Sequence, residues 1–209
     1  MIAALTGIGL SAAAGLNAYI PFLIVALIAK YTDVITLPAS YAWMESWWAI
    51  GIGAVLLLTE LVLDKVPAVD SINDAVHTFI RPGMGGLLSA ATAGATELDN
   101  SAWMAQHPWV GVVLGVVVAG LVHAGKATAR PVANLSTAGV GAPVVSTVED
   151  GASVGLSLIA LFAPLLVIVA LLVLAIAFSW LWWRLRAWRR GRRAAEPLPP
   201  ARTRPGSAA

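Results

Sequence analysis

The chain has 209 residues, of which 59% are hydrophobic and only 11% are charged, and its mean hydropathy is +0.82. Soluble domains usually contain about 25% charged residues, and a soluble fold of this size leaves a large exterior in water. The composition therefore excludes an ordinary soluble protein and predicts a multi-pass integral membrane protein. The absence of cysteine excludes a disulfide framework, a thiolate metal site and a cysteine nucleophile.

Charge is distributed unevenly along the chain. Residues 1–183 hold five basic and ten acidic side chains, a balance of −5, whereas residues 184–209 hold eight arginines and one glutamate, a balance of +7. A basic segment beside a hydrophobic span is typical of a cytoplasmic flank that contacts anionic lipid head groups, here at the Arg184–Arg193 cluster. We expect a transmembrane domain over 1–183 and a basic, Pro- and Ala-rich, disordered cytoplasmic tail over 184–209. Nucleic acid is not an expected partner, because no recognisable module accompanies the arginines.

The N-terminal residues 2–29 carry no charge and are long enough to cross roughly 30 Å of hydrocarbon. Since a positive N-terminal region and a persuasive cleavage site are both missing, the segment predicts a retained span and not a signal peptide. Pro21 is expected to kink this helix, with Asn17 one turn before it. Residues 31–46 then predict a loop, and an interfacial tryptophan belt opens a second span from about Trp47 to Leu63.

The segment 67–82 differs in kind. Asp70, Asp74, His77 and Arg81 recur at i, i+4, i+7 and i+11, which is one face of a helix, so we expect an amphipathic helix that ends at Pro82. Residues 83–96 are uncharged and rich in glycine and alanine. Because they are short for a full crossing, they predict either a re-entrant segment or a tightly packed span.

A further span is expected from Pro108 to about Val122, followed by His123, Lys126 and Arg130 on one helical face. Residues 131–148, which include Asn134, form a second uncharged stretch that proline and glycine interrupt. Ser146 and Glu149 have the spacing of a capping box, which would start the last helix. The uncharged residues 151–183 then predict one long span, bent at Pro164. The expected fold is an all-α polytopic transmembrane helical bundle, with about four full spans and two short interrupted or re-entrant segments.

The two halves of the chain share a plan. Each has a span that opens with tryptophan, a charged cluster at the end of that span, an Arg-Pro pair and then an interrupted apolar stretch. His77-x3-Arg81-Pro82 aligns with Lys126-x3-Arg130-Pro131. Interrupted segments in corresponding positions are typical of transporters built from repeats, so an internal repeat is one hypothesis for this chain.

Charged residues inside or next to spans are the candidates for function, because an ionised group in hydrocarbon usually faces a cavity or a partner. We expect Glu60 and Asp64 to pair with Lys126 and Arg130 in the interior. Such pairs either stabilise the fold without further function or line a pathway and exchange partners. The candidate substrate or ion pathway comprises Glu60, Asp64, Lys65, Asp70, Asp74, His77, Arg81, His123, Lys126, Arg130, Asn134, Ser146, Glu149 and Asp150.

Other chemistry receives less support. The face of Asp70, Asp74, His77 and Arg81 has residue types that suit a metal or a phosphate, yet many wet helix faces look the same, so no metal or other cofactor is expected. Arg81 and Arg130, beside expected chain breaks, suit an anionic group better. The motifs GxSxG, HExxH, GxGxxG and the P-loop are all absent, and we therefore do not expect an enzyme.

Four motifs together carry a family resemblance: GLNAYIPFL (15–23), ELVLDKVPAVDSINDAVHTFIRPGMG (60–85), HAGKATAR (123–130) and PVVSTVED (143–150). In order and spacing they resemble a family of small bacterial membrane proteins catalogued as a domain of unknown function. The resemblance covers about residues 5–175. It implies a bacterial inner-membrane protein, brings no established activity, and leaves the Arg-rich tail as an addition to the family core.

The leading functional hypothesis is a small transporter or translocase of an anionic small molecule or lipid. Arg81, Lys126 and Arg130 would attract the negative group, and the acidic residues would couple protons or exchange salt bridges. A non-transporting membrane scaffold or partner subunit is the alternative, and an intramembrane lipid-modifying enzyme is the third hypothesis. The expected location is the bacterial cytoplasmic membrane with the C-terminus in the cytoplasm, and the sequence leaves a homo-oligomer open.

Overall fold

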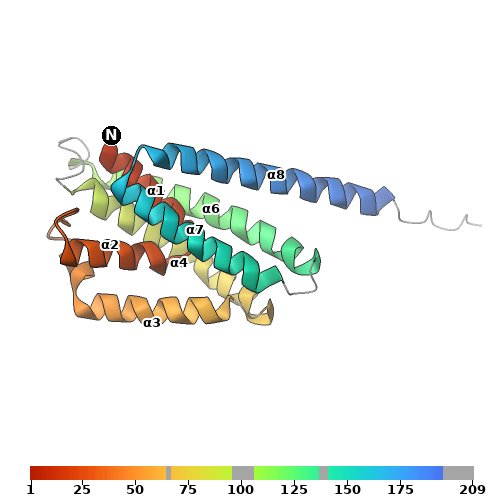
Figure 1. Cartoon of the computed structure of the whole chain (residues 1–209), viewed down its shortest axis with the longest axis horizontal. Coiled ribbons are helices and arrows are strands. Elements are labelled where there is room, and N and C mark those ends of the chain that lie inside the picture. Colours follow the sequence, from red (N-terminus) through yellow and green to blue (C-terminus); the bar gives the residue numbers. More distant parts are fainter. Residues whose placement is uncertain (65–66, 96–105, 137–140, 195–209) are drawn as a thin grey trace, which may run out of the picture.

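The computed structural model of the chain describes residues 1–64, 67–95, 106–136 and 141–194, and the described part is all-α. The helices lie side by side in a bundle, with the N-terminus at one end and the end of α8 at the other (Figure 1). The helices are α1 (Ile2–Leu16), α2 (Tyr19–Tyr31), the 3₁₀ helix η1 (Ala42–Glu45), α3 (Trp47–Leu63), α4 (Pro67–Ala93), α6 (Pro108–Ser136), α7 (Gly141–Phe162) and α8 (Leu166–Ala194).

The expected single span over residues 2–29 is wrong, because the chain breaks at Asn17 and Ala18 and forms two short helices. Asn17 has extended backbone angles of φ −143° and ψ 125°, and its side-chain oxygen accepts hydrogen bonds from the backbone N–H groups of Tyr19 and Ile20. A side chain thus satisfies the first donors of α2, as at a helix N-terminus. The break therefore lies before Pro21, the residue expected to kink a continuous helix.

α1 and α2 form a helical hairpin whose tip lies inside the bundle. At the outer end of α1, Gly7 packs against Ser89 and Thr92 near the end of α4. At the outer end of α2, Tyr31 contacts Trp47, which opens α3 at the same end of the bundle (Figure 1). The 15 residues of α1 span only about 22 Å, so the hairpin enters the bundle and returns without crossing it.

α4 is one helix of 27 residues that continues through Pro82, which corrects two expectations. The amphipathic helix does not end at Pro82, and residues 83–93 are not a separate re-entrant segment. Gly85 and Gly86 do not terminate the helix; instead they let α4 approach α6 so closely that an added Cβ would collide with Ala119 and Val116. Close backbone approach at small residues is the usual way that helices associate in a membrane.

α6 likewise continues past Arg130 and Pro131 to Ser136, so neither Arg-Pro pair marks a chain break. The two halves of the chain therefore share a sequence pattern with proline and glycine interruptions, but in the structure each Arg-Pro pair lies within a continuous helix. The internal repeat stays a hypothesis.

The C-terminal part also differs from expectation. The long span over residues 151–183 is instead two helices, because α7 ends at Phe162 and α8 begins at Leu166 after a turn at Pro164. Ser146 lies inside α7, which begins at Gly141, so the proposed capping box does not exist. α8 runs past the expected domain boundary at Trp183 as far as Ala194.

The outer surface of the described bundle is largely apolar, and its interior holds charged side chains beside an apolar core. Phe79 is 82% exposed and Val55 is 63% exposed, whereas Arg81 and Lys126 are at most 1% exposed. Two helical segments, Trp109–Thr128 and Pro143–Phe162, are long and apolar enough to cross a membrane, and the expected four full spans are not confirmed.

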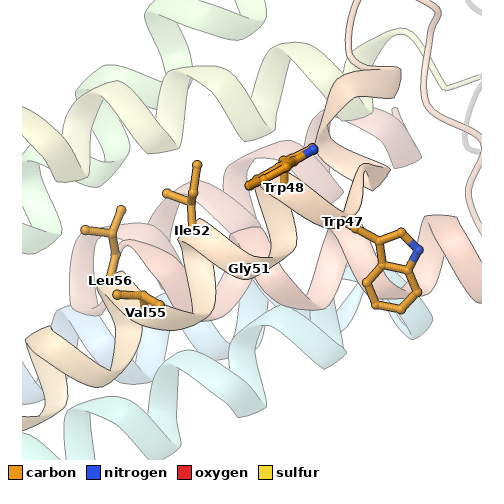
Figure 2. A pocket seen from close by; sticks show the side chains of 6 residues that line it. All are labelled: Trp47, Trp48, Gly51, Ile52, Val55 and Leu56. Atoms are coloured by element: carbon orange, nitrogen blue, oxygen red, sulfur yellow. The ribbon is translucent and has the colours of Figure 1, made fainter.

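α3 presents a shallow apolar groove of about 600 Å³ on its outer face. Figure 2 shows the side chains that line it, which all come from α3: Trp47, Trp48, Gly51, Ile52, Val55 and Leu56. The groove is separate from the charged interior. Glu60, which lies in α3, and Asp64, which is the C-cap of α3, are both buried.

Candidate functional site

A buried charge cluster lies where the tip of the α1–α2 hairpin meets α3, α4, α6 and α7. We define the buried charge cluster by nine residues: Glu60, Asp64, Asp74, His77, Arg81, His123, Lys126, Glu149 and Asp150. They come from four different elements and most of them are almost completely buried. Ionisable groups in such a setting require partners, since an unpaired buried charge is costly.

Arg81 of α4 is the first centre of the cluster. Its Nη2 atom donates a 2.7 Å hydrogen bond to Oε1 of Glu60 and lies 3.9 Å from Oδ2 of Asp64. Its Nη1 atom lies 3.5 Å from Oδ1 of Asp74. Three carboxylates thus surround one guanidinium, and the nearest makes a charge-assisted hydrogen bond, which is about twice as strong as a neutral one.

Lys126 of α6 is the second centre. Its ammonium lies 3.0 Å from Oε2 of Glu149 and 3.5 Å from Oδ2 of Asp64, and it donates a 2.8 Å hydrogen bond to the backbone carbonyl of Leu16. Leu16 is the last residue of α1, and carbonyls at a helix C-terminus lack intrahelical partners and carry partial negative charge. Lys126 therefore ties the hairpin tip to two carboxylates.

The two histidines flank Arg81. Nε2 of His77 lies 3.5 Å from Oε1 of Glu60, and its Nδ1 lies 2.8 Å from the carbonyl of Asn73. Nδ1 of His123 lies 3.0 Å from Nη1 of Arg81, and because guanidinium only donates, this imidazole nitrogen accepts. The proton on neutral His123 therefore resides on Nε2, which lies 3.2 Å from the hydroxyl of Thr78.

The hairpin tip adds polar groups from the other side. The Asn17 amide donates a 2.9 Å hydrogen bond to Oδ1 of Asp150 while its oxygen caps α2. The ring of Tyr19 meets the ring of His77 edge-on at 5.9 Å. The break in the chain thus places an amide, an aromatic ring and a free helix end at the charge cluster.

Several buried polar atoms of this region have no hydrogen-bond partner within the described part of the chain. They are Oε2 of Glu60, Nε of Arg81, Nε2 of His77 and the hydroxyl of Ser146. Buried polar groups are nearly always hydrogen-bonded in native proteins, so atoms of this kind in one cluster indicate a place for water, an ion or a ligand.

The charges of the cluster do not balance. Among the side chains that the structure describes here, five carboxylates face two permanent cations, Arg81 and Lys126, which is an excess of three negative charges when the carboxylates are ionised and the histidines are neutral. Each cation already has at least two carboxylates within 4.0 Å. The arrangement therefore has capacity for further positive charge, in the form of protons or a cation.

Comparison with known proteins gives the chain a family. It belongs to the domain of unknown function DUF4126, which matches residues 4–184. The DUF4126 match covers nearly all of the expected transmembrane domain and ends at the first arginine of the tail. No curated protein and no solved structure matches the chain.

In this DUF4126 protein the structure brings together most of the residues that the sequence singled out. The pairing of Asp64 with Lys126 is confirmed. Glu60, by contrast, pairs with Arg81 and not with Lys126, because α3 packs its buried end against α4. Lys65 and the side chains of Asp70, Arg130 and Asn134 lie outside the described residues.

The interpretation of α4 as a helix with a wet polar face is wrong for the described residues. His77 is 4% exposed and Arg81 is not exposed at all, since this face points into the bundle and the apolar face points outward. Among the described residues, no group of three or more histidines or carboxylates is arranged to hold a metal ion.

The sequence did not identify four participants: Asn17, Asn73, Thr78 and the carbonyl of Leu16. Asn73 donates a 2.6 Å hydrogen bond to Asp64 and so fixes that carboxylate between Arg81 and Lys126. Asn17 gave a signal, because it is the one amide side chain in the charge-free run 2–29. A backbone carbonyl gives no such signal.

Proposed function

We propose that this protein is a small secondary carrier of the bacterial cytoplasmic membrane, and that the buried charge cluster is its translocation site. One observation carries the proposal: a helix that breaks inside the bundle, at Asn17, ends on a sealed group of charged residues. Carriers commonly bind their substrates and coupling ions at discontinuous helices, whose free ends supply partial charges. We propose no catalytic reaction for the site.

The apolar exterior supports the membrane location. A bundle that exposes Phe79 and Val55 while it buries Arg81 has the polarity expected in lipid and the reverse of that expected in water. We infer that α3, α4, α6, α7 and α8 cross the membrane and that the α1–α2 hairpin enters from one side.

The orientation follows from the charges at the two ends. α8 ends in the arginine cluster, which the positive-inside rule assigns to the cytoplasm, and Arg186 stacks on Trp182 at 4.9 Å. The opposite end of the bundle carries Asp33 and Glu45 with Lys30. We therefore propose that the hairpin enters from the outer side and that the arginines contact anionic lipid head groups.

The expected anionic substrate receives less support than a cationic one. Arg81, Lys126 and Arg130 were expected to attract a negative charge. Arg81 and Lys126 are occupied by carboxylates, and the side chain of Arg130 lies outside the described residues. An anion would have to displace those carboxylates and enter a cluster that already has negative excess. A proton or a cation meets no such opposition.

A scaffold function is the second candidate, and two observations favour it. The charges are closed off and paired with one another, as in a purely structural core, and α3 offers an apolar groove on the surface. In that case the charges would hold the bundle together and the outer face would bind another membrane protein.

Charge movement in proteoliposomes distinguishes the two candidates. Purified protein is adsorbed on a solid-supported membrane and exposed to steps of pH, sodium, methylammonium and phosphate. A carrier gives transient currents with the wild-type protein, and Asp33→Asn, an exchange of an exposed carboxylate, leaves them unchanged. A scaffold gives no current for any step, and that result would overturn the proposal.

A further inference from the structure

The ammonium of Lys126 occupies a complete set of oxygen acceptors. We propose that these oxygens are the substrate site of the carrier, and that the substrate is a small primary ammonium ion which replaces the lysine ammonium during the transport cycle. The inference rests on the proposed carrier function and names the class of its substrate.

Three oxygens from three separate elements form the site, which we call the ammonium site. They are the Leu16 carbonyl at 2.8 Å, Oε2 of Glu149 at 3.0 Å and Oδ2 of Asp64 at 3.5 Å. A primary ammonium has three N–H donors, so the number of acceptors matches the number of donors. The site already binds the functional group of the proposed substrate, in the form of the lysine side chain.

The backbone oxygen is unusual because it comes from a helix that stops inside the bundle. The Leu16 carbonyl lies at the C-terminus of α1, where the helix dipole concentrates partial negative charge. Asn17 holds this end in place through its hydrogen bonds to Asp150 and to the start of α2. Half-helix C-termini of this kind coordinate cations in carriers with discontinuous helices.

An independent observation lies one turn away on α7. Ser146 precedes Glu149 by three residues, so both side chains lie on one face of the helix. Ser146 is 1% exposed, and its hydroxyl has no hydrogen-bond partner among the residues that the structure describes. A buried hydroxyl of this kind is costly to leave unpaired, and an ion that enters beside Glu149 would give it a partner.

The side chain of Lys126 is flexible enough to leave the site. Its stem has four rotatable carbons, and a lysine ammonium is a compact point charge without fixed geometry. The described side chains of the charge cluster include more carboxylates than permanent cations, so an additional ammonium ion would reduce a negative excess. A carrier that exchanges its own lysine for the substrate would keep the site filled in both states.

A metal ion fits the site less well than an ammonium ion. Two carboxylates and one carbonyl are fewer ligands than the six to eight oxygens that Ca²⁺ takes or the octahedral set that Mg²⁺ demands. No group of three or more carboxylates or imidazoles that would hold a metal exists in the described ranges of the chain.

The first test asks whether the emptied site binds a free ammonium ion. Lys126→Ala removes the lysine, and the melting temperature of the purified variant is measured with methylammonium chloride and with choline chloride at equal ionic strength. We expect methylammonium to raise the melting temperature of this variant and choline, which has no N–H donor, to leave it unchanged. Lys126→Met, which fills the space with an apolar chain, is the matched control and should not respond.

A double variant shows that the effect comes from this site. When Glu149→Gln is added to Lys126→Ala, the site loses a carboxylate, and the response to methylammonium should disappear. If methylammonium and choline act alike on Lys126→Ala, or if the double variant responds as the single one does, the ammonium site is overturned.

The second test uses the wild-type chain and so does not depend on the folding of a variant. A step of methylammonium should give a saturable current in proteoliposomes, and Ser146→Ala should weaken its apparent affinity by about tenfold, the equivalent of one lost hydrogen bond to a charged group. If other solutes drive currents and methylammonium does not, the substrate class is wrong while the carrier function stands. If methylammonium stabilises Lys126→Ala but no solute drives a current, the ammonium site stands and the carrier function fails.

Discussion

The guanidinium of Arg81 donates a 2.7 Å hydrogen bond to Glu60, and neither side chain is more than 1% exposed. Neither group has access to water in this arrangement, so each depends on the other for the stability of its charged form. A buried ion pair of this type adds little compared with an apolar pair of the same volume, but removal of one partner leaves an uncompensated charge.

Replacement of Glu60 by glutamine should therefore destabilise the fold strongly. The neutral amide keeps the shape of the side chain and removes the nearest of the three carboxylate charges that face Arg81. We expect a loss of about 3–5 kcal/mol in the free energy of unfolding, the usual cost of breaking a buried pair. Reversible unfolding in mixed detergent micelles, followed by tryptophan fluorescence, measures it.

Two further variants test the cause. Asp33→Asn changes an exposed carboxylate in the same way and should leave unfolding unchanged. Glu60→Gln combined with Arg81→Met removes both charges of the closest pair and should recover part of the lost stability, since Asp74 and Asp64 still lose the cation that they share with Glu60. Equal instability of the single and the double variant would show that the pair does not account for the effect.

Patterns along one helix predicted which residues share a face, and the structure confirms that in part. Asp74, His77 and Arg81 do lie together, and Lys126 does pair with Asp64. The spacing did not indicate whether the face of α4 points to water or into the bundle. In a chain whose exterior is apolar, a polar face is an inward face, and the composition alone contained that information.

Chain breaks were harder to predict than faces. Pro82 and Pro131 were expected to end helices, yet both lie inside continuous ones, because neighbouring helices and side-chain hydroxyls can satisfy backbone groups that proline frees in a membrane. The real break occurs at Asn17, where no proline or glycine is present. There the tertiary partners Lys126 and Asp150 stabilise the two free helix ends, and no local pattern reveals partners so distant in sequence.

Exchange of Asn17 and Asp150 should show that the hairpin tip depends on their contact. Asn17→Asp alone keeps an oxygen that can cap α2 but places a second carboxylate beside Asp150. We expect this variant to lose more stability than the roughly 0.5–2 kcal/mol that the loss of a helix cap typically costs. Asn17→Asp combined with Asp150→Asn restores an amide opposite a carboxylate and should recover most of that loss. Thermal unfolding of the wild-type chain, the single variants Asn17→Asp and Asp150→Asn, and the double variant measures the coupling, and additive effects would contradict it.

Gly115 should be intolerant of even a methyl group. A Cβ atom at this position would collide with the carbonyl of Gly85, where α4 and α6 approach each other most closely, and a backbone atom has no rotamer to move away. We expect Gly115→Ala to cost about 1–3 kcal/mol, as over-packed cores do. Gly83→Ala, on the open side of α4, is the matched control and should leave the melting temperature unchanged or slightly higher. Equal effects of the two substitutions would show that helix propensity, and not the contact between α4 and α6, decides the outcome.

The orientation of the bundle can be tested directly, since the chain contains no cysteine to interfere with labelling. Ser40, in the exposed segment between α2 and α3, and Arg186, near the end of α8, lie at opposite ends of the bundle (Figure 1). A membrane-impermeant maleimide added to intact inner-membrane spheroplasts should label Ser40→Cys at once and Arg186→Cys only after the membrane is opened. The physical reason is the charge difference between the ends, which favours retention of the arginine end in the cytoplasm.

Labelling of both positions from outside would contradict an odd number of crossings. The reverse pattern would place the re-entrant hairpin on the cytoplasmic side.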